Sequence, residues 1–158
     1  MRKKKEISYV MVKPEFANNE FVVLEIRKRL RDAGLKILDA SYVYYDKDAA
    51  RKHYAEHINK GFYQGLEDYI TSGKAYGMIV EGKNAISVIR NLVQKDKKIG
   101  LQEGDIRYDI PTIYNFPIDT TKNVVHASDC EESAKHEILI YRELKEKYTT
   151  SKNDKENE

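Results

Sequence analysis

The chain has 158 residues, of which 41% are hydrophobic, and its 28 basic and 26 acidic side chains leave a formal net charge of +2. This length allows one globular domain with a buried core, and the near balance of charge argues against a protein that depends on nucleic acid or an anionic membrane. The single cysteine excludes an internal disulfide framework, no apolar run is long enough to cross a bilayer, and the basic first residues lack the apolar core of a secretion signal. We therefore expect a cytoplasmic protein.

The chain begins with a predicted strand, helix and strand. Residues 7–12 are rich in β-branched and aromatic side chains and stop just before a proline, which predicts a buried strand that ends beside Lys13. Apolar residues at helical spacing predict an amphipathic helix over 18–33, which Gly34 closes. Residues 35–45 have the composition of a second strand.

Three helical segments and a third strand follow. Aspartates near residue 46 can cap a short polar helix that reaches about residue 58, and an apolar face over 62–70 predicts a second helix that ends at Gly73. Residues 75–80 are typical of a strand, and a helical period returns over 85–93. No period holds over the segment 95–122, which is interrupted by glycines and prolines and is expected to be a long functional or mobile loop.

The last helix is predicted to start at Ser128, because Ser128 and Glu131 have the spacing of a capping box. Helical spacing continues to residue 148, but residues 138–141 fit a fourth strand equally well, and periodicity does not decide between them. The charged segment 149–158 lacks apolar anchors and is expected to be a disordered tail, which makes 1–148 a single α+β domain.

Two polar motifs were weighed as chemical sites. His53 and His57 are four residues apart and could share a metal ion, but no third ligand is evident, so a solvated helix face is favoured. Cys130 falls among acidic residues that would raise the pKa of its thiol, which favours a structural role. The glycine-rich phosphate loop of many nucleotide-binding proteins does not occur in the sequence.

His126 is the strongest candidate for a reactive group. It comes just before a helix start, where free backbone N–H groups and the helix dipole favour a phosphate or another anion. Ser128 and Glu137 follow, and either could orient the imidazole so that one ring nitrogen is free to attack. Local physics alone leaves open a packed or solvated histidine.

Five motifs, taken together, resemble those of nucleoside diphosphate kinases. They are VKPEF at 12–16, HY at 53–54, EGKNAISVIR at 81–90, GDIRYD at 104–109 and NVVHASDCEESAKHEI at 123–138. The likeness covers residues 8–141, and the histidine segment is its most specific part.

The resemblance implies a nucleoside diphosphate kinase that works by a ping-pong mechanism. His126 would attack the γ-phosphate of a nucleoside triphosphate and become a phosphohistidine, from which a nucleoside diphosphate takes the phosphoryl group. Ser128 and Glu137 would set the position and basicity of the ring. Tyr54 would reach toward the phosphates beside Lys13.

The resemblance also implies the nucleotide contacts. Lys13, Arg90 and Arg107 would hold phosphate oxygens, Asn123 would bind the sugar and phosphate region, and Phe62 would stack on the base. The cofactor would be Mg²⁺, held mainly by the nucleotide phosphates and water, so no metal ligand is assigned to the protein. The implied fold is a ferredoxin-like βαββαβ antiparallel sheet with additional helices, in which 138–141 is the last strand, and the implied assembly is a homo-oligomer, a tetramer or hexamer.

The sequence departs from the family pattern at three places. Asp96 stands where the family has a hydroxyl that donates to phosphate, and its carboxylate would repel phosphates unless Mg²⁺ or the neighbouring lysines 95, 97 and 98 compensate. The stretch 95–104 lacks a proline of the family's trimer contacts. The segment 110–122 is longer than usual, either as a tolerated surface insertion or as a lid or subunit contact.

Two other functions are kept as alternatives. One is a kinase-like module that binds nucleotide or a protein partner with weak or no turnover, which Asp96 and the altered loop suggest. The other is a ferredoxin-like nucleic-acid binder, which the near-neutral charge disfavours.

Overall fold

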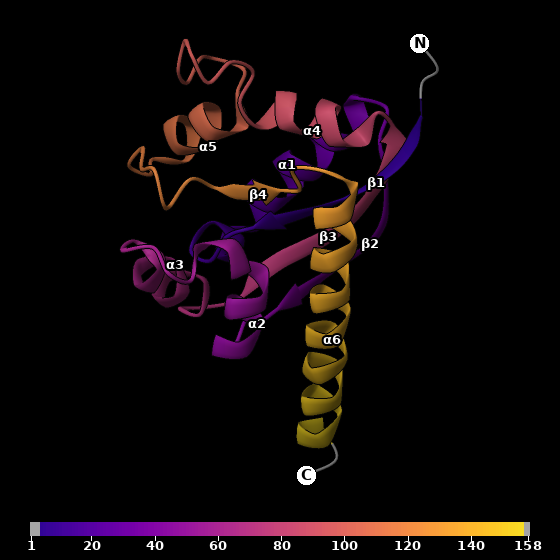
Figure 1. The fold of residues 1–158 in the computed structure, drawn as a ribbon. Helices are drawn as coiled ribbons and strands as arrows, with labels where there is room; N and C mark the ends of the chain where they lie inside the picture. Colours follow the sequence, from indigo (N-terminus) through magenta and orange to yellow (C-terminus); the bar gives the residue numbers. More distant parts are fainter. Residues whose placement is uncertain (1–3, 157–158) are drawn as a thin grey trace.

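The computed structural model describes residues 4–156, with side chains through residue 149, and places helices on both faces of an antiparallel sheet (Figure 1). The strands are β1 (Lys5–Val12), β2 (Lys36–Val43), β3 (Ala75–Lys83) and β4 (Val125–Ala127). The helices are α1 (Glu20–Asp32), α2 (Lys47–His53), α3 (Tyr63–Ile70), α4 (Ala85–Val93), α5 (Ile106–Tyr114) and α6 (Glu131–Glu156), with short 3₁₀ turns at Phe16–Asn18 and Ala55–His57.

The strand order across the sheet is β2-β3-β1-β4, and every neighbouring pair is antiparallel. The path β1-α1-β2-β3-α4-β4 gives the βαββαβ frame of a ferredoxin-like fold, which confirms the predicted α+β class. Helices α2 and α3 are added between β2 and β3, α5 is added before β4, and α6 follows β4.

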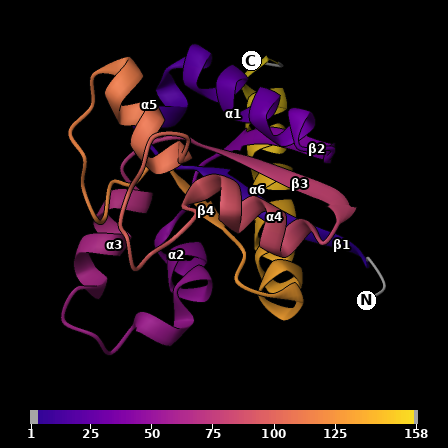
Figure 2. The same cartoon turned by 90° about the horizontal axis from the view of Figure 1, so that it is seen from above.

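The sheet is buried on both faces because alternate side chains of the central strand β1 enter two separate cores. Val10 and Val12 pack on the side covered by α1, α4 and α5. Tyr9 and Met11 pack on the opposite side, against α2, α3 and α6. Figure 2 shows α4 and α6 on the two sides of the sheet.

The fourth strand is not the segment that the family resemblance implied. Residues 138–141 lie inside α6, where Ile138 and Tyr141 face the sheet and Leu139 is 61% exposed, as helical spacing requires. The fourth strand is instead Val125–Ala127, which pairs with β1 so that His126 lies opposite Met11. The candidate nucleophile is therefore built into the sheet.

The start of α6 also differs from the prediction. The helix begins at Glu131, and the hydroxyl of Ser128 accepts from the backbone N–H of Tyr9 at 3.0 Å and donates to Glu137 at 2.6 Å. Ser128 thus ties the helix to β1, and the predicted capping box with Glu131 does not form.

The predicted loop over 95–122 and the predicted tail over 149–158 both contain regular structure that the sequence did not indicate. Helix α5 occupies residues 106–114, within the segment that showed no period, and Asp105 closes the preceding loop by accepting from the backbone N–H groups of Lys95 and Gln102 at 3.0 Å each. Helix α6 continues to Glu156, so the backbone of 149–156 is helical and the last two residues of the predicted tail lie outside the described residues. Among residues 4–156, no helix is both long enough and apolar enough to span a membrane.

Candidate active site

His126 lies at the junction between the sheet and α6. It is the middle residue of β4, and the sharp entry to this short strand is made by Val124, whose backbone has a φ of 79°. The pairing of β4 with β1 fixes the backbone of His126, and its side chain stays 20% exposed. A histidine held by a sheet yet open to solvent can meet a ligand without local unfolding.

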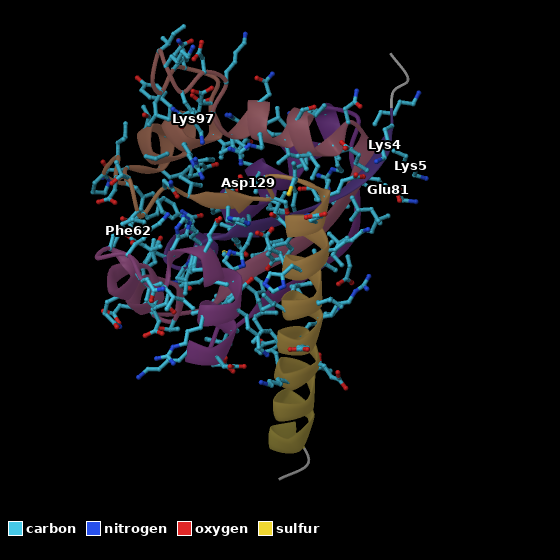
Figure 3. The ribbon with its side chains drawn as sticks, viewed as in Figure 1. Lys4, Lys5, Phe62, Glu81, Lys97 and Asp129 are labelled. Carbon is cyan, nitrogen blue, oxygen red and sulfur yellow. The ribbon has the colours of Figure 1, made fainter. Side chains whose placement is uncertain are left out.

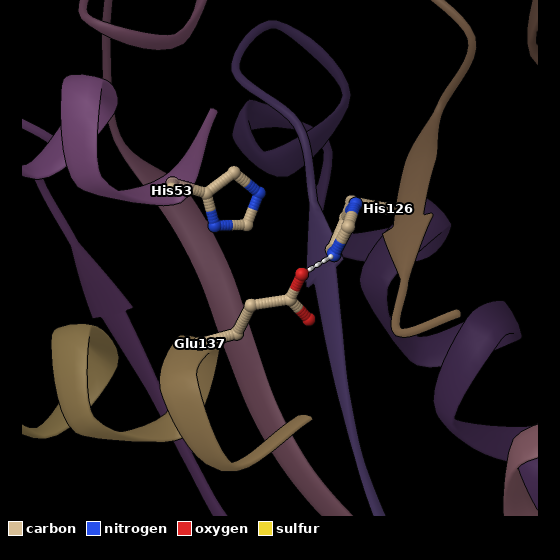
Figure 4. Close-up of side chains that lie close together, drawn as sticks. All are labelled: His53, His126 and Glu137. Atoms are coloured by element: carbon tan, nitrogen blue, oxygen red, sulfur yellow. Dashed lines mark ion pairs between the residues drawn. The ribbon is translucent and has the colours of Figure 1, made fainter. Parts of the chain in front are cut away.

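Glu137 links His126 to Ser128 in the buried base of the site. Its Oε1 accepts from the Ser128 hydroxyl at 2.6 Å, and its Oε2 lies 2.9 Å from Nε2 of His126 (Figure 4). The Nε2 contact is close but out of line for a hydrogen bond, so the carboxylate acts on the ring through its charge. Because Nε2 faces the carboxylate, the ring nitrogen Nδ1 is the one left for a substrate.

Lys13, at the end of β1, forms the second part of the predicted site. Its Nζ donates to Oδ1 of Asn123 at 2.6 Å and to the backbone oxygen of Thr121 at 3.3 Å. The side chain is only 8% exposed, and burial, followed by repulsion from Arg107, lowers the pKa of Lys13 to about 7. An anion that reaches a buried lysine of this kind strongly stabilises its charged form.

Arg107 and Arg90 carry the positive charge from Lys13 toward His126. The guanidinium of Arg107, at the start of α5, donates to the backbone oxygens of Asn123 and Val125 at 3.2 and 3.0 Å. Burial, with a further contribution from Arg90, lowers the pKa of Arg107 to about 10, and Asp129 partly opposes the shift. Arg90 itself pairs with Asp129 at 2.6 Å.

A cavity of about 350 Å³ opens on His126. The predicted residues that line it are Tyr54, Arg90, Arg107, His126 and Glu137. The structure thus brings together the candidate nucleophile, the carboxylate beside it and two of the three cations that were predicted to hold phosphate. Burial raises the pKa of Tyr54 to about 12, so its hydroxyl remains a proton donor at neutral pH.

Phe62 and Asn123 lie outside the residues that line this cavity. Phe62 precedes α3 (Figure 3), is 56% exposed and has its ring 5.5 Å from that of His57. Its exposure excludes the core position that helical periodicity alone would assign, and it leaves the ring face available for stacking.

Asp96 does not point its charge at the phosphate cations. Its Oδ1 accepts from the backbone N–H groups of Lys98 and Ile99 at 2.8 and 3.4 Å, which closes a turn after α4. The next residue, Lys97, does line the His126 cavity, and Figure 3 marks its position. Lys97, which was predicted only as a charge that compensates Asp96, is therefore itself a lining residue of this cavity.

His53 is the residue whose position the sequence missed most clearly. It was expected on a solvated face with His57, but it is 8% exposed and its ring centroid lies 4.5 Å from that of His126. Burial, and then the proximity of His126, holds the pKa of His53 well below its usual range. The spacing of Ala49 and His53, which share the buried face of α2, is the signal that could have revealed it.

Cys130 also differs from the expectation. Its sulfur lies 3.3 Å from the hydroxyl of Ser133, and this hydrogen bond is the main reason that the pKa of Cys130 is lowered instead of raised. Cys130 is exposed and forms no part of the cavity lining.

Comparison with known proteins decides the family. The model of the family described as nucleoside diphosphate kinase matches residues 6–146. The chain belongs to the nucleoside diphosphate kinase family. A nucleoside diphosphate kinase from Listeria monocytogenes serotype 4b (strain F2365) is 40% identical over 136 residues, which cover 86% of this chain and 88% of that protein. One from Archaeoglobus fulgidus is 43% identical over 136 residues, which cover 86% and 85% of the two chains.

Solved structures of nucleoside diphosphate kinases share the fold. The Aquifex aeolicus enzyme matches with a TM-score of 0.74 and 26% identity over 87% of this chain and 95% of that one. The Halobacterium salinarum enzyme, solved in complex with CDP, matches with a TM-score of 0.73 and 30% identity over 89% of this chain and 88% of that one. The predicted family and its ferredoxin-like frame are therefore confirmed.

Proposed function

We propose that this protein is a nucleoside diphosphate kinase that transfers the γ-phosphate of a nucleoside triphosphate to a nucleoside diphosphate through a phosphohistidine on His126. The observation that carries the proposal is the arrangement of His126, with Glu137 at 2.9 Å behind Nε2, in a cavity that two arginines also line. A nucleophile backed by a carboxylate and faced by fixed cations is what phosphoryl transfer requires.

In the first half-reaction the lone pair on Nδ1 of His126 attacks the γ-phosphorus. A bond forms between nitrogen and phosphorus, the bond to the bridging oxygen breaks, and the nucleoside diphosphate leaves with that electron pair. Glu137 favours the tautomer with its proton on Nε2 and stabilises the positive charge that the ring gains, while Ser128 holds Glu137 in place. In the second half-reaction a terminal oxygen of another nucleoside diphosphate attacks the phosphorus and restores His126.

Three cations bind the phosphates in this scheme. Arg90 and Arg107 line the His126 cavity, and Lys13 lies buried behind Arg107 with its Nζ on Asn123. Arg90 exchanges its pairing with Asp129 for a phosphate oxygen, and Lys97 supplies a further positive charge from the loop after α4.

The remaining assignments complete the proposed nucleotide site. Phe62 stacks on the base, which gives broad tolerance because every base has a π-face. Asn123 contacts the sugar and phosphate region, and Tyr54 donates toward the phosphates. Mg²⁺ would be held mainly by the nucleotide phosphates and water and would neutralise part of their charge, since the described residues gather only two imidazoles and one carboxylate as possible metal ligands, a set that does not suit Mg²⁺.

We also propose a cytoplasmic homo-oligomer, a tetramer or hexamer. The exposed apolar side chains of Phe21, Leu24 and Leu38 on α1 and the edge strand β2 support self-association. The mass of the purified protein in solution, measured by light scattering, tests this assignment.

The deciding experiment is labelling with γ-³²P-ATP and Mg²⁺. The wild type is expected to give an acid-labile, base-stable phosphoprotein that returns its label to added nucleoside diphosphate. The variants His126→Ala and His136→Ala form a matched pair, because His136 is an exposed histidine that lines the same cavity. Equal labelling of wild type and His126→Ala contradicts the proposal.

The alternative of a binding module with weak turnover is favoured by one observation, the 2.6 Å pairing of Arg90 with Asp129, which phosphate must displace. It predicts that nucleotide binds while little label reaches the protein or an added acceptor. The second step of the same labelling experiment separates the two functions.

A further inference from the structure

His53 presents an unused imidazole to the site. It is 8% exposed, and neither of its ring nitrogens has a hydrogen-bond partner among the described residues. Leaving such a group unpaired costs free energy, so a buried polar ring without a partner calls for an explanation. Tyr9, Tyr45 and Tyr54 surround it with aromatic rings at centroid distances of 6.5, 5.6 and 4.7 Å.

The rings of His53 and His126 meet edge to face, with an interplanar angle of 71°, and Glu137 lies beside both (Figure 4). One ligand atom from each of the three residues lies within 4.8 Å of the other two. Bonds of about 2.0 to 2.2 Å to a tetrahedral ion need ligand atoms roughly 3.4 Å apart. Side-chain rotations that move the ligand atoms by about 1 Å would therefore complete the site.

We propose that His53, His126 and Glu137 form a binding site for a divalent transition-metal ion of the Zn²⁺ class, with a water molecule from the cavity as fourth ligand. Two imidazoles and one carboxylate suit Zn²⁺, Co²⁺ or Cu²⁺, and they suit the oxygen-seeking Mg²⁺ poorly. Ser128 already fixes Oε1 of Glu137, so Oε2 is held ready as a ligand.

The charges around the site allow such an ion. Arg90 and Arg107 line the same cavity and oppose a cation, but the buried carboxylate of Glu137, which also lines it, attracts one. Neither ring nitrogen of His53 has a hydrogen-bond partner among the described residues, so no protein group competes with a metal for its lone pair.

Binding of the metal inhibits the phosphoryl transfer described above, and this consequence rests on the proposed function. An ion bound at Nε2 of His126 leaves the ring proton on Nδ1, the nitrogen that attacks phosphorus. The metal-bound protein therefore still binds nucleotide through Lys13 and Phe62 but does not accept a phosphoryl group.

Metal binding is tested without any kinase assay, by titrating the protein with Co²⁺ alone. The wild type is expected to bind one equivalent with the visible absorption of a tetrahedral ion, and Zn²⁺ is expected to displace it while excess Mg²⁺ does not. Long-range ¹⁵N spectra of the imidazoles should show Zn²⁺ shifting the His53 and His126 nitrogens together. A Zn²⁺ titration that leaves the His53 signals unchanged overturns the proposal.

Variants supply the second test. His53→Phe keeps a ring in the aromatic pocket, and its thermal unfolding without metal shows whether it folds; it is expected to bind Co²⁺ about 10- to 100-fold more weakly. His57→Gln and Cys130→Ser remove nearby donors that are not ligands and are expected to bind as the wild type does. Equal Co²⁺ binding by His53→Phe and wild type overturns the proposal, and the spectra of the wild type decide it if the variant does not fold.

Inhibition is measured last, as the ratio of phosphohistidine formed with and without Zn²⁺ in excess Mg²⁺-ATP. Zn²⁺ is expected to lower this ratio in the wild type and to leave it near one in His53→Phe. If the protein binds Co²⁺ as expected but no variant or wild type becomes labelled, the proposed kinase function fails while the metal site stands.

Discussion

Oε2 of Glu137 lies 2.9 Å from Nε2 of His126, although one residue belongs to α6 and the other to β4. The carboxylate is buried, and Ser128 holds its other oxygen at 2.6 Å. The position of the carboxylate relative to the His126 ring therefore depends on how α6 packs on the sheet. The negative charge beside the ring comes from the Glu137 side chain.

Glu137→Gln should slow phosphoryl transfer without weakening nucleotide binding. The amide keeps the shape and the contact with Ser128, but it cannot stabilise the positive charge that His126 gains on phosphorylation. We expect a loss of about 10²-fold in the rate of phosphohistidine formation, measured in a single turnover. Ser128→Ala, which frees the carboxylate but keeps its charge, should cost less, and an unchanged rate in Glu137→Gln contradicts the assigned role.

Nucleotide binding should take up a proton above pH 7. Lys13 has a pKa of about 7 in the free protein, so it is charged below that pH and neutral above it. Bound phosphate favours the ammonium form, hence affinity falls as the pH rises above 7 and a proton enters with the nucleotide. Calorimetry at pH 8 in two buffers of different ionisation enthalpy should detect the uptake, and Lys13→Met should abolish it.

The same group affects the stability of the free protein with the opposite sign. The pKa of Lys13 falls from 10.5 to about 7 on folding, so between these values the unfolded chain binds more protons. The contribution of Lys13 to the free energy of unfolding therefore rises with pH across this window. Urea denaturation of wild type and Lys13→Met at pH 7 and 9 should show the difference.

Lys97→Ala should weaken the binding of nucleoside triphosphates, because Lys97 lines the His126 cavity beside Arg90 and Arg107. Loss of one phosphate contact of this kind is expected to cost about 1.5 to 3 kcal/mol, or roughly 10- to 160-fold in affinity. Lys98→Ala is the matched control, since Lys98 is also exposed but does not line that cavity. Equal effects of the two variants would show that only the net charge of the loop matters.

Phe62→Ala should weaken the binding of all nucleotides by a similar factor. Stacking of a base on an aromatic ring contributes about 1 to 3 kcal/mol and does not depend on the pattern of hydrogen bonds. Equilibrium binding of purine and pyrimidine diphosphates measures the effect. Selective loss for one base would mean that Phe62 reads the base edge instead of its face.

Gly77→Ala should destabilise the fold. A Cβ atom on Gly77 in β3 would lie 2.6 Å from Cδ1 of Tyr141 and 2.7 Å from the hydroxyl of Tyr9, both of which are fully buried. Such overpacking is expected to cost about 1 to 3 kcal/mol in the free energy of unfolding, measured with urea. In Gly65→Ala, where nothing lies within 4 Å, the helix propensity of alanine should raise stability instead.

Most of the regular elements before residue 94 were predictable because their hydrophobic periods are local. The strand before Lys13, the helix closed by Gly34 and the helix over 85–93 follow directly from spacing and end signals. The family and its frame followed from motifs, above all the histidine segment.

Two elements of the second half were hidden by composition. Pro111 is usually a helix breaker, yet it lies buried inside α5, so the segment that contains it showed no helical signal. Strand β4 is three residues long, too short for a pattern, and exists because β1 offers an edge. Residues 138–141 fitted both a strand and a helix, and they are helical in the structure, where Ile138 and Tyr141 pack against the sheet.

The site residues that belong to the family motifs were predicted from the sequence. The position of His53 was missed because it depends on burial. The structure brings together His126, Glu137, Arg90, Arg107 and Tyr54. His53 was misjudged because its exposure depends on packing between α2 and the sheet, which no local pattern reports. The carboxylate of Asp96 accepts from a neighbouring backbone N–H group, a contact that no local pattern reports.

Because β4 pairs with β1, His126 can take its place in the sheet only late in synthesis of the chain. Strand β1 leaves the ribosome first, but one of its edges stays open until residues 125–127 emerge and close it. A chain stopped before that point carries Arg90, Arg107 and Lys13 but lacks His126, and residues 10–12 of β1 have no partner on that side. The candidate nucleophile and the partner of this part of β1 should therefore be acquired in the same step.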